Sequence, residues 1–95
     1  MKPKKEEIMD FDVANHLKTD DDIRRFLKIS AENATVPEFI HALNTAARAK
    51  GMTEIAKKAG VTRASLYKSL ADGGNPRFDT ISKVVEALGC KIVVS

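Results

Sequence analysis

Within residues 53–70, TEIAKKAGVTRASLYKSL, four side chains have types and spacing that suit contacts with nucleic acid. Arg63 can donate two hydrogen bonds to guanine O6 and N7, and the Ala64 methyl group can contact the methyl group of thymine. Ser65 can bond a base edge or a phosphate, and Lys68 suits a phosphate. The alternative is an ordinary solvated helix face, and it is stronger for Ala64 and Lys68 than for Arg63 and Ser65.

Other side chains near this segment can add contacts, although each also has a purely structural explanation. Thr62 can cap a helix, and its hydroxyl can also meet a phosphate. Tyr67 can support its own helix or reach the DNA backbone through its hydroxyl. Asn75 and Arg77 suit either phosphate contacts or a turn. The sequence therefore predicts a DNA-binding set made of Thr62, Arg63, Ala64, Ser65, Tyr67, Lys68, Asn75 and Arg77.

Two short helices that meet at a tight corner are predicted to position this set. The first runs from about Thr53 to Ala59, and Gly60 follows where the chain must turn left-handed. Thr62 can cap the second helix, Arg63 to Leu70. The side chains expected to face inward are Ile55, Ala59, Val61, Leu66 and Leu70. This is the pattern of a helix-turn-helix, whose second helix enters the DNA major groove. The alternative is a helical hairpin of an α-domain that does not bind DNA.

Three further helices are predicted from apolar spacing and from residues that start or stop helices. They cover about residues 20–33, 37–50 and 79–88, and Pro37 suits a first helical position. The residues expected to cap or close them are Thr19, Asp20, Gly51, Asp79 or Thr80, and Gly89. The chain is thus expected to be all-α, with five helices.

Both ends of the chain are predicted to differ from this helical body. Residues 1–18 have the composition of an arm, in which FDVANHL could dock as an extended segment. Residues 90–94, CKIVV, are too short for another helix and are rich in β-branched residues, which predicts a short C-terminal β-strand. This strand needs a partner, either FDVANHL or a strand of a second subunit, and a β-ladder across a dimer is the preferred arrangement. The expected organisation is an arm at 1–18 and one helical domain at 19–95, with the helix-turn-helix at 53–70.

Charge favours nucleic acid as a partner of the second half of the chain. Residues 1–50 carry nine basic and nine acidic side chains, whereas residues 51–95 carry seven basic and four acidic ones. The net charge of +3 therefore lies in the half that holds the predicted helix-turn-helix, where it attracts a polyanion.

Catalysis, metal binding and membrane insertion find no support in the sequence. His16 and His41 lack Cys or carboxylate partners at ligand spacing, and no phosphate-binding loop or nucleophile elbow is present. No apolar run reaches membrane-spanning length, and the first ten residues lack the apolar stretch of a signal peptide. The single cysteine, Cys90, cannot form an internal disulfide and is expected to be a small core residue. We expect a cytoplasmic protein that is not an enzyme and uses no cofactor.

Residues 51–94, GMTEIAKKAGVTRASLYKSLADGGNPRFDTISKVVEALGCKIVV, resemble the lambda-repressor/Cro-like helix-turn-helix domain. SLYKSL and GGNPRFDT, together with FDVANHL, DDDIRRFLKIS and PEFIHALNTAARAKGM upstream, are similar to the HigA-like addiction-module antidotes. These antitoxins are encoded beside a RelE/HigB-like mRNA-cleaving toxin. The resemblance implies a homodimer that binds operator DNA, represses its own operon and neutralises its toxin by direct binding.

Two alternatives to an antitoxin stay open. One is a free-standing Cro-like or repressor-like regulator without a toxin, but the 50 residues ahead of the helix-turn-helix are more than such a domain needs. The other is an interaction module that has lost DNA binding, against which Arg63 and Lys68 argue. If a toxin exists, its contact surface is expected on the N-terminal arm and the first two helices, apart from the DNA surface.

Overall fold

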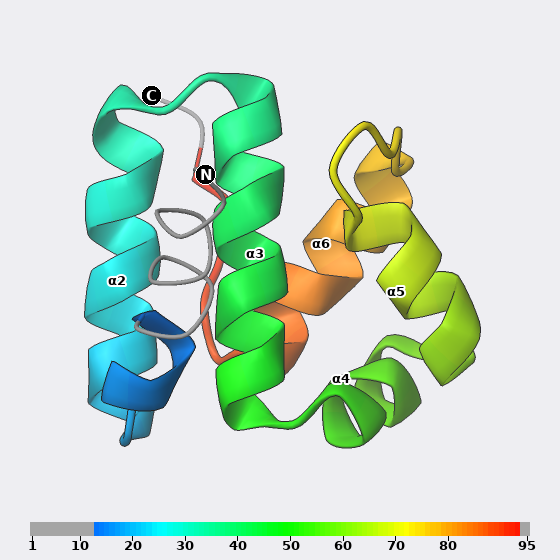
Figure 1. Ribbon diagram of the computed structural model, residues 1–95, viewed down its shortest axis with the longest axis horizontal. Helices are drawn as coiled ribbons and strands as arrows, with labels where there is room; N and C mark the ends of the chain where they lie inside the picture. The colour runs from blue at the N-terminus through cyan, green and yellow to red at the C-terminus, as the bar shows by residue number, and fades with distance from the viewer. Residues whose placement is uncertain (1–12, 94–95) are drawn as a thin grey trace, which may run out of the picture.

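Five helices account for most of residues 13–93, the part of the chain that the computed structural model describes. In Figure 1, the first two lie side by side as an antiparallel pair, and the shorter helices pack on the opposite side of the second. Their bounds are α2 Asp20–Asn33, α3 Val36–Lys50, α4 Met52–Ala59, α5 Arg63–Leu70 and α6 Phe78–Ala87. The expectation of an all-α chain is correct for the described residues, apart from its C-terminal strand. A short helix at residues 13–16, where an extended segment was expected, adds to the five helices predicted.

Reciprocal hydrogen bonds between a cap and the third helical residue fix where α2 and α3 begin. The Asp22 amide donates to Thr19 Oγ1 over 3.0 Å, and the Thr19 amide donates back to Asp22 Oδ2 over 3.2 Å. Thr35 and Glu38 repeat this capping box at the start of α3. The cap predicted at Thr19 is therefore confirmed, while α3 begins at Val36, one residue before the predicted Pro37.

The core lies where α3 meets the three helices that follow it. The largest side chains that are fully buried come from α3, α4, α5 and α6, and they are Leu43, Ile55, Leu66, Leu70 and Val84. Four of the five residues predicted to face inward around the α4–α5 corner are buried, while Val61 is half-buried and packs against the core. This packing presents the opposite side of α5 to solvent.

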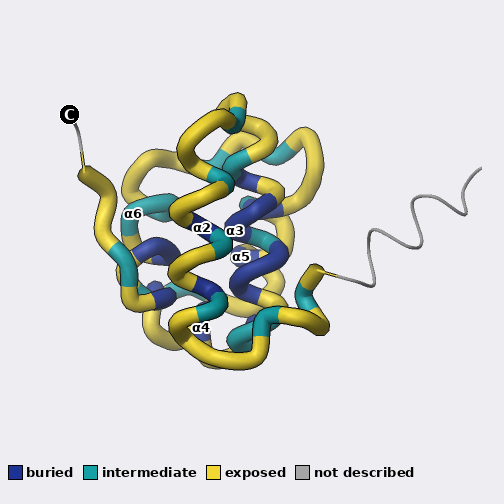
Figure 2. Tube along the Cα trace, turned by 90° about the vertical axis from the view of Figure 1, so that its left-hand side faces the viewer, coloured by how far each residue is buried: buried dark blue, intermediate teal, exposed yellow. Residues whose placement is uncertain are grey.

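The β-strand predicted at 90–94 is wrong for the residues that can be described. Cys90 donates its amide to the Val85 carbonyl over 3.0 Å, and residues 91–93 then form no strand. β-Branched residues favour a strand only where a neighbouring strand offers hydrogen bonds. One of the two segments expected to offer them, FDVANHL, is helical over residues 13–16, and its first two residues lie outside the described range. The exposed segment runs over the surface after α6 (Figure 2).

The predicted cap of α6 is also wrong, for a local reason. Arg77 occupies the cap position and forms no side-chain cap hydrogen bond. Asp79 instead lies in the first helical turn, where its carboxylate is 3.3 Å from Lys83 Nζ. The negative charge of Asp79 therefore stabilises the positive, N-terminal end of the helix dipole, although its side chain does not cap the helix.

The capping box of α2 generates a prediction about acid stability. The backbone amides of Lys18 and Thr19 donate to the Asp22 carboxylate and hold its pKa below the ordinary value of 3.8. A carboxyl group whose pKa is lower in the folded state stabilises the fold above its unfolded pKa, and this contribution is lost as pH falls through the folded pKa. We expect Asp22→Asn to melt at a lower temperature than the parent near neutral pH. The difference in melting temperature between the two proteins should shrink below pH 3.8. A difference that stays constant across an acid titration would contradict this.

Candidate nucleic-acid interface

The corner between α4 and α5 is built by three consecutive residues. Gly60 adopts the left-handed conformation, with φ 75° and ψ 28°, which ends α4 as predicted. Val61 donates its amide to the Ala56 carbonyl over 3.0 Å and so closes the turn. Thr62 Oγ1 accepts the Ser65 amide over 3.0 Å, which confirms the predicted cap and starts α5 at Arg63.

The eight residues of the predicted DNA-binding set are distributed over α5 and the segment that follows it. Six of them come from the cap and the outer face of α5, and all six are exposed: Thr62, Arg63, Ala64, Ser65, Tyr67 and Lys68. Asn75 and Arg77 are exposed in the segment between α5 and α6. The buried side chains of this helix, Leu66 and Leu70, keep the outer face turned to solvent.

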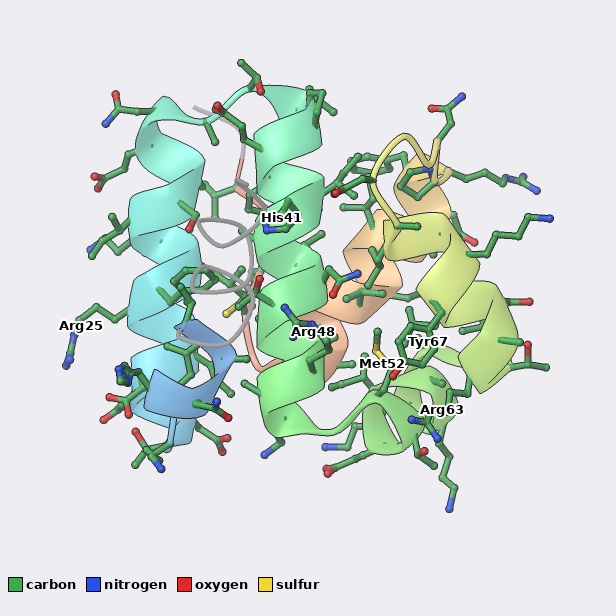
Figure 3. The ribbon with its side chains drawn as sticks, viewed as in Figure 1. Arg25, His41, Arg48, Met52, Arg63 and Tyr67 are labelled. Atoms are coloured by element: carbon green, nitrogen blue, oxygen red, sulfur yellow. The ribbon has the colours of Figure 1, made fainter. Side chains whose placement is uncertain are left out.

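Arg63 and Tyr67 form a pair that the sequence analysis missed. The Arg63 guanidinium donates to the Tyr67 hydroxyl over 3.2 Å and lies 5.3 Å from the centre of the ring. The two side chains lie together at the start of α5 (Figure 3). Their i, i+4 spacing on a predicted helix is the signal that would have found them. The pair orients the guanidinium while leaving its other N–H donors for a ligand.

The chain after α5 turns back against the end of that helix, and only glycine fits at its tightest point. A Cβ atom at Gly74 would lie 2.8 Å from the Ser69 carbonyl oxygen and 2.9 Å from that of Ala71. Such distances are far shorter than a van der Waals contact, so any other residue would push the loop away. Gly74 therefore determines the path by which Asn75 and Arg77 follow α5.

Polar residues of α3 hold the other end of α5. The Asn44 side-chain amide donates to the Leu70 carbonyl over 3.0 Å, and Arg48 Nε donates to Asn44 Oδ1 over 2.9 Å. One turn earlier, His41 Nδ1 lies 3.2 Å from Asp72 Oδ1. His41 and Arg48 lie on α3 in Figure 3. The sequence shows that these three residues share one face of α3. It does not show their partners, because Asn44 and Leu70 are 26 residues apart and His41 and Asp72 are 31 residues apart.

Basic side chains dominate the charge of this surface. α5 contains Arg63 and Lys68 and no acidic residue. On α4, Lys58 Nζ lies 3.2 Å from Glu54 Oε2, so one of the two lysines of that helix is partly neutralised. The outer face of α5 is basic and carries short polar side chains. Such a face suits a polyanionic partner such as nucleic acid.

Two other kinds of site are absent from residues 13–93. No three His, Cys, Asp or Glu side chains there come together in a way that could hold a metal ion. None of the helices in the same range combines the length and the apolar character that crossing a membrane requires.

The contact between Asn44 and Leu70 predicts a measurable loss of stability. Asn44→Ala removes the donor from a half-buried carbonyl at the end of α5, and a lost hydrogen bond of this kind costs about 1 kcal/mol. We expect urea denaturation to show a free energy of unfolding lower by about this amount. Asn33→Ala, on the exposed end of α2, serves as the control, and equal stability of the two variants would contradict the role of Asn44.

Comparison with known proteins supports a family assignment. A family model described as "Probable addiction module antidote protein" matches residues 7–95. An uncharacterized protein of Haemophilus influenzae is 39% identical over 89 residues, which cover 94% of this chain and 92% of that protein. No solved structure matches the chain. Because the family model spans nearly the whole sequence, the chain belongs to the family of probable addiction module antidote proteins.

Proposed function

We propose that this protein is a cytoplasmic antitoxin that binds operator DNA through a helix-turn-helix formed by α4 and α5. In this proposal it represses its own operon and neutralises a RelE/HigB-like mRNA-cleaving toxin by direct binding, without catalysing a reaction. One observation carries the DNA-binding part: the start of α5 exposes Arg63, Ala64 and Ser65, while Leu66 and Leu70 are fully buried behind them. The family description supports the antitoxin part.

The geometry of α5 supports a specific mode of DNA binding. A helix whose first turn enters the major groove presents its N-terminal side chains to base edges. In this proposal Arg63 makes a bidentate contact with guanine, and its hydrogen bond to Tyr67 limits the directions in which the guanidinium can point. The Thr62 oxygen accepts the Ser65 amide, but the hydroxyl hydrogen of Thr62 stays available to a phosphate. Lys68, one turn on, supplies a second phosphate contact.

A toxin partner follows from the family at a general level, and its RelE/HigB-like type is part of our proposal. The alternative, a Cro-like or repressor-like regulator without a toxin, shares the DNA-binding surface and lacks the second partner. The two functions differ in what the neighbouring reading frame encodes. A small protein that inhibits growth when produced alone, and is neutralised by this chain, would favour the antitoxin.

Loss of the Arg63 side chain tests the DNA-binding surface. We expect Arg63→Ala to weaken binding to the DNA upstream of its own gene by about 1–3 kcal/mol, the range for a bidentate base contact. The fold should survive because the side chain is exposed. Arg25→Ala, which removes an exposed arginine from α2, is the matched control. The measurement is a titration at fixed salt, and equal affinity of Arg63→Ala and the parent would remove Arg63 from the interface.

The proposed operator binding also predicts a homodimer. One helix contacts only a few base pairs, so two copies related by a two-fold axis are needed for a palindromic site. We expect light scattering at micromolar concentration to give twice the chain mass for the protein alone, or twice the chain mass plus that of the DNA with a palindromic operator. A monomer under both conditions would contradict this part of the proposal.

A further inference from the structure

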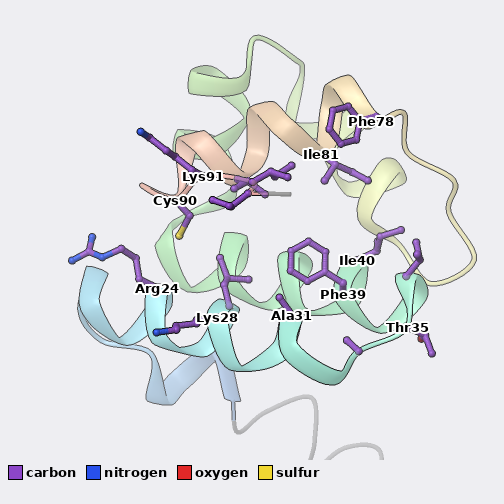
Figure 4. A pocket seen from close by; sticks show the side chains of 16 residues that line it. Arg24, Lys28, Ala31, Thr35, Phe39, Ile40, Phe78, Ile81, Cys90 and Lys91 are labelled. Atoms are coloured by element: carbon purple, nitrogen blue, oxygen red, sulfur yellow. The ribbon is translucent and has the colours of Figure 1, made fainter. Parts of the chain in front are cut away.

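An apolar groove runs between α2 and α6 on the side of the molecule away from the outer face of α5. The backbones of the two helices stay apart, and α3 forms the floor between them with Phe39 and Ile40 (Figure 4). The segment after α6 continues the second wall through Ile92 and Val93. The hollow measures about 660 Å³, within the range of about 300–1,000 Å³ that is usual for binding pockets.

Large apolar side chains gather at this groove although they are exposed. Val36 and Phe78 each keep 70% of their surface accessible, and Val93 keeps 78%. With Ile92, these residues are four of the seven exposed large apolar residues in the described part of the chain, and all four line the groove. A contiguous apolar surface of this kind marks an interaction site more often than a scatter of single residues does.

The charges of the groove are all of one sign. Arg24, Lys28 and Lys91 lie together at one end of it, and Phe78 lies toward the other end (Figure 4). None of the sixteen described residues that line it is acidic. Arg24 pairs with Asp21, whereas Lys28 and Lys91 form no ion pair with any residue in 13–93. The occupant should therefore bring carboxylates to this end.

Charge and shape together argue against two other occupants. A second copy that docks on this face through a two-fold axis presents the same lining, which holds three cations and no carboxylate, so it offers Lys28 and Lys91 no opposite charge. DNA would satisfy the cations but would leave the exposed Val36, Phe78 and Val93 uncovered. A protein segment with an apolar face and acidic residues near one end satisfies both features, as amphipathic helices do in other apolar grooves.

We propose that the groove between α2 and α6 binds the toxin, through an amphipathic helix whose apolar face packs on Phe39, Phe78 and Ile81 and whose acidic end meets Lys28 and Lys91. This inference rests on the proposed antitoxin function and adds the contact surface and the chemistry of the bound segment. It places the toxin on α2 and α3, which the sequence analysis also named, leaves out the N-terminal arm named with them, and adds α6 and the segment after it. The DNA-binding face of α5 stays free.

The test uses the full chain and, as the probe, the purified protein encoded by the adjacent reading frame. Two variants change the groove, Lys28→Glu for its charge and Phe78→Ser for its apolar wall. Each has a matched control on α2 outside the groove: Arg25→Glu for the charge, and Ile29→Ser, at a site that is 62% exposed, for the apolar surface. Calorimetry gives the dissociation constant of each complex.

We expect the two groove variants to raise the dissociation constant about tenfold or more and the controls to change it less than about twofold. Operator affinity of Lys28→Glu should stay at the parent level. The only cysteine of the chain, Cys90, lines the groove and gives a second readout. Its alkylation by iodoacetamide, followed by mass spectrometry, should slow when the toxin binds.

Several results would overturn the assignment. Toxin binding by the groove variants at the parent affinity would exclude this surface. Conversion of a dimer to a monomer by the same variants would identify a second copy as the occupant. Faster alkylation of Cys90 after removal of residues 1–12, without toxin, would identify the chain's own N-terminal segment. If the parent does not bind the adjacent protein at all, the proposed antitoxin function fails, and the groove assignment fails with it.

Discussion

The arrangement of this protein depends on burying the short helices α4 and α5 against α3. Each of the two contains only eight residues, and isolated helices of that length do not persist in water. Ile55 and Leu66, together with Leu70, are fully buried in a core that also holds Leu43 of α3. The apolar contact therefore keeps the corner folded, and every property assigned to the outer face of α5 depends on it.

Features encoded by neighbouring residues were predictable from the sequence. α5 has the predicted bounds because Gly60 ends one helix and Thr62 caps the next, and both effects act within a few residues. The strand at 90–94 failed because a strand also needs a partner, and a sequence does not reveal whether that partner adopts another structure. The helical residues 13–16 removed FDVANHL, one of the two expected partners.

In the candidate sites too, local features were predictable from the sequence and features that depend on tertiary packing were not. Exposure of Arg63, Ala64, Ser65 and Lys68 followed from helical spacing alone. The contact from Asn44 to the Leu70 carbonyl joins residues 26 positions apart, and no local pattern identifies it. The apolar groove escaped prediction for a stronger reason. Its walls come from three separate parts of the chain, so it exists only after α2, α3 and α6 have packed.

The turn that starts α5 has a consequence for how such proteins diversify. Gly60 and Thr62 set the backbone, and Leu66 and Leu70 fill the core, so the exposed side chains at Arg63, Ala64 and Ser65 carry little of the folding task. Exchanging these three residues would change the chemical groups that the helix presents to solvent at almost no cost in stability. The exposed start of α5 can therefore change through a few surface substitutions while the fold persists.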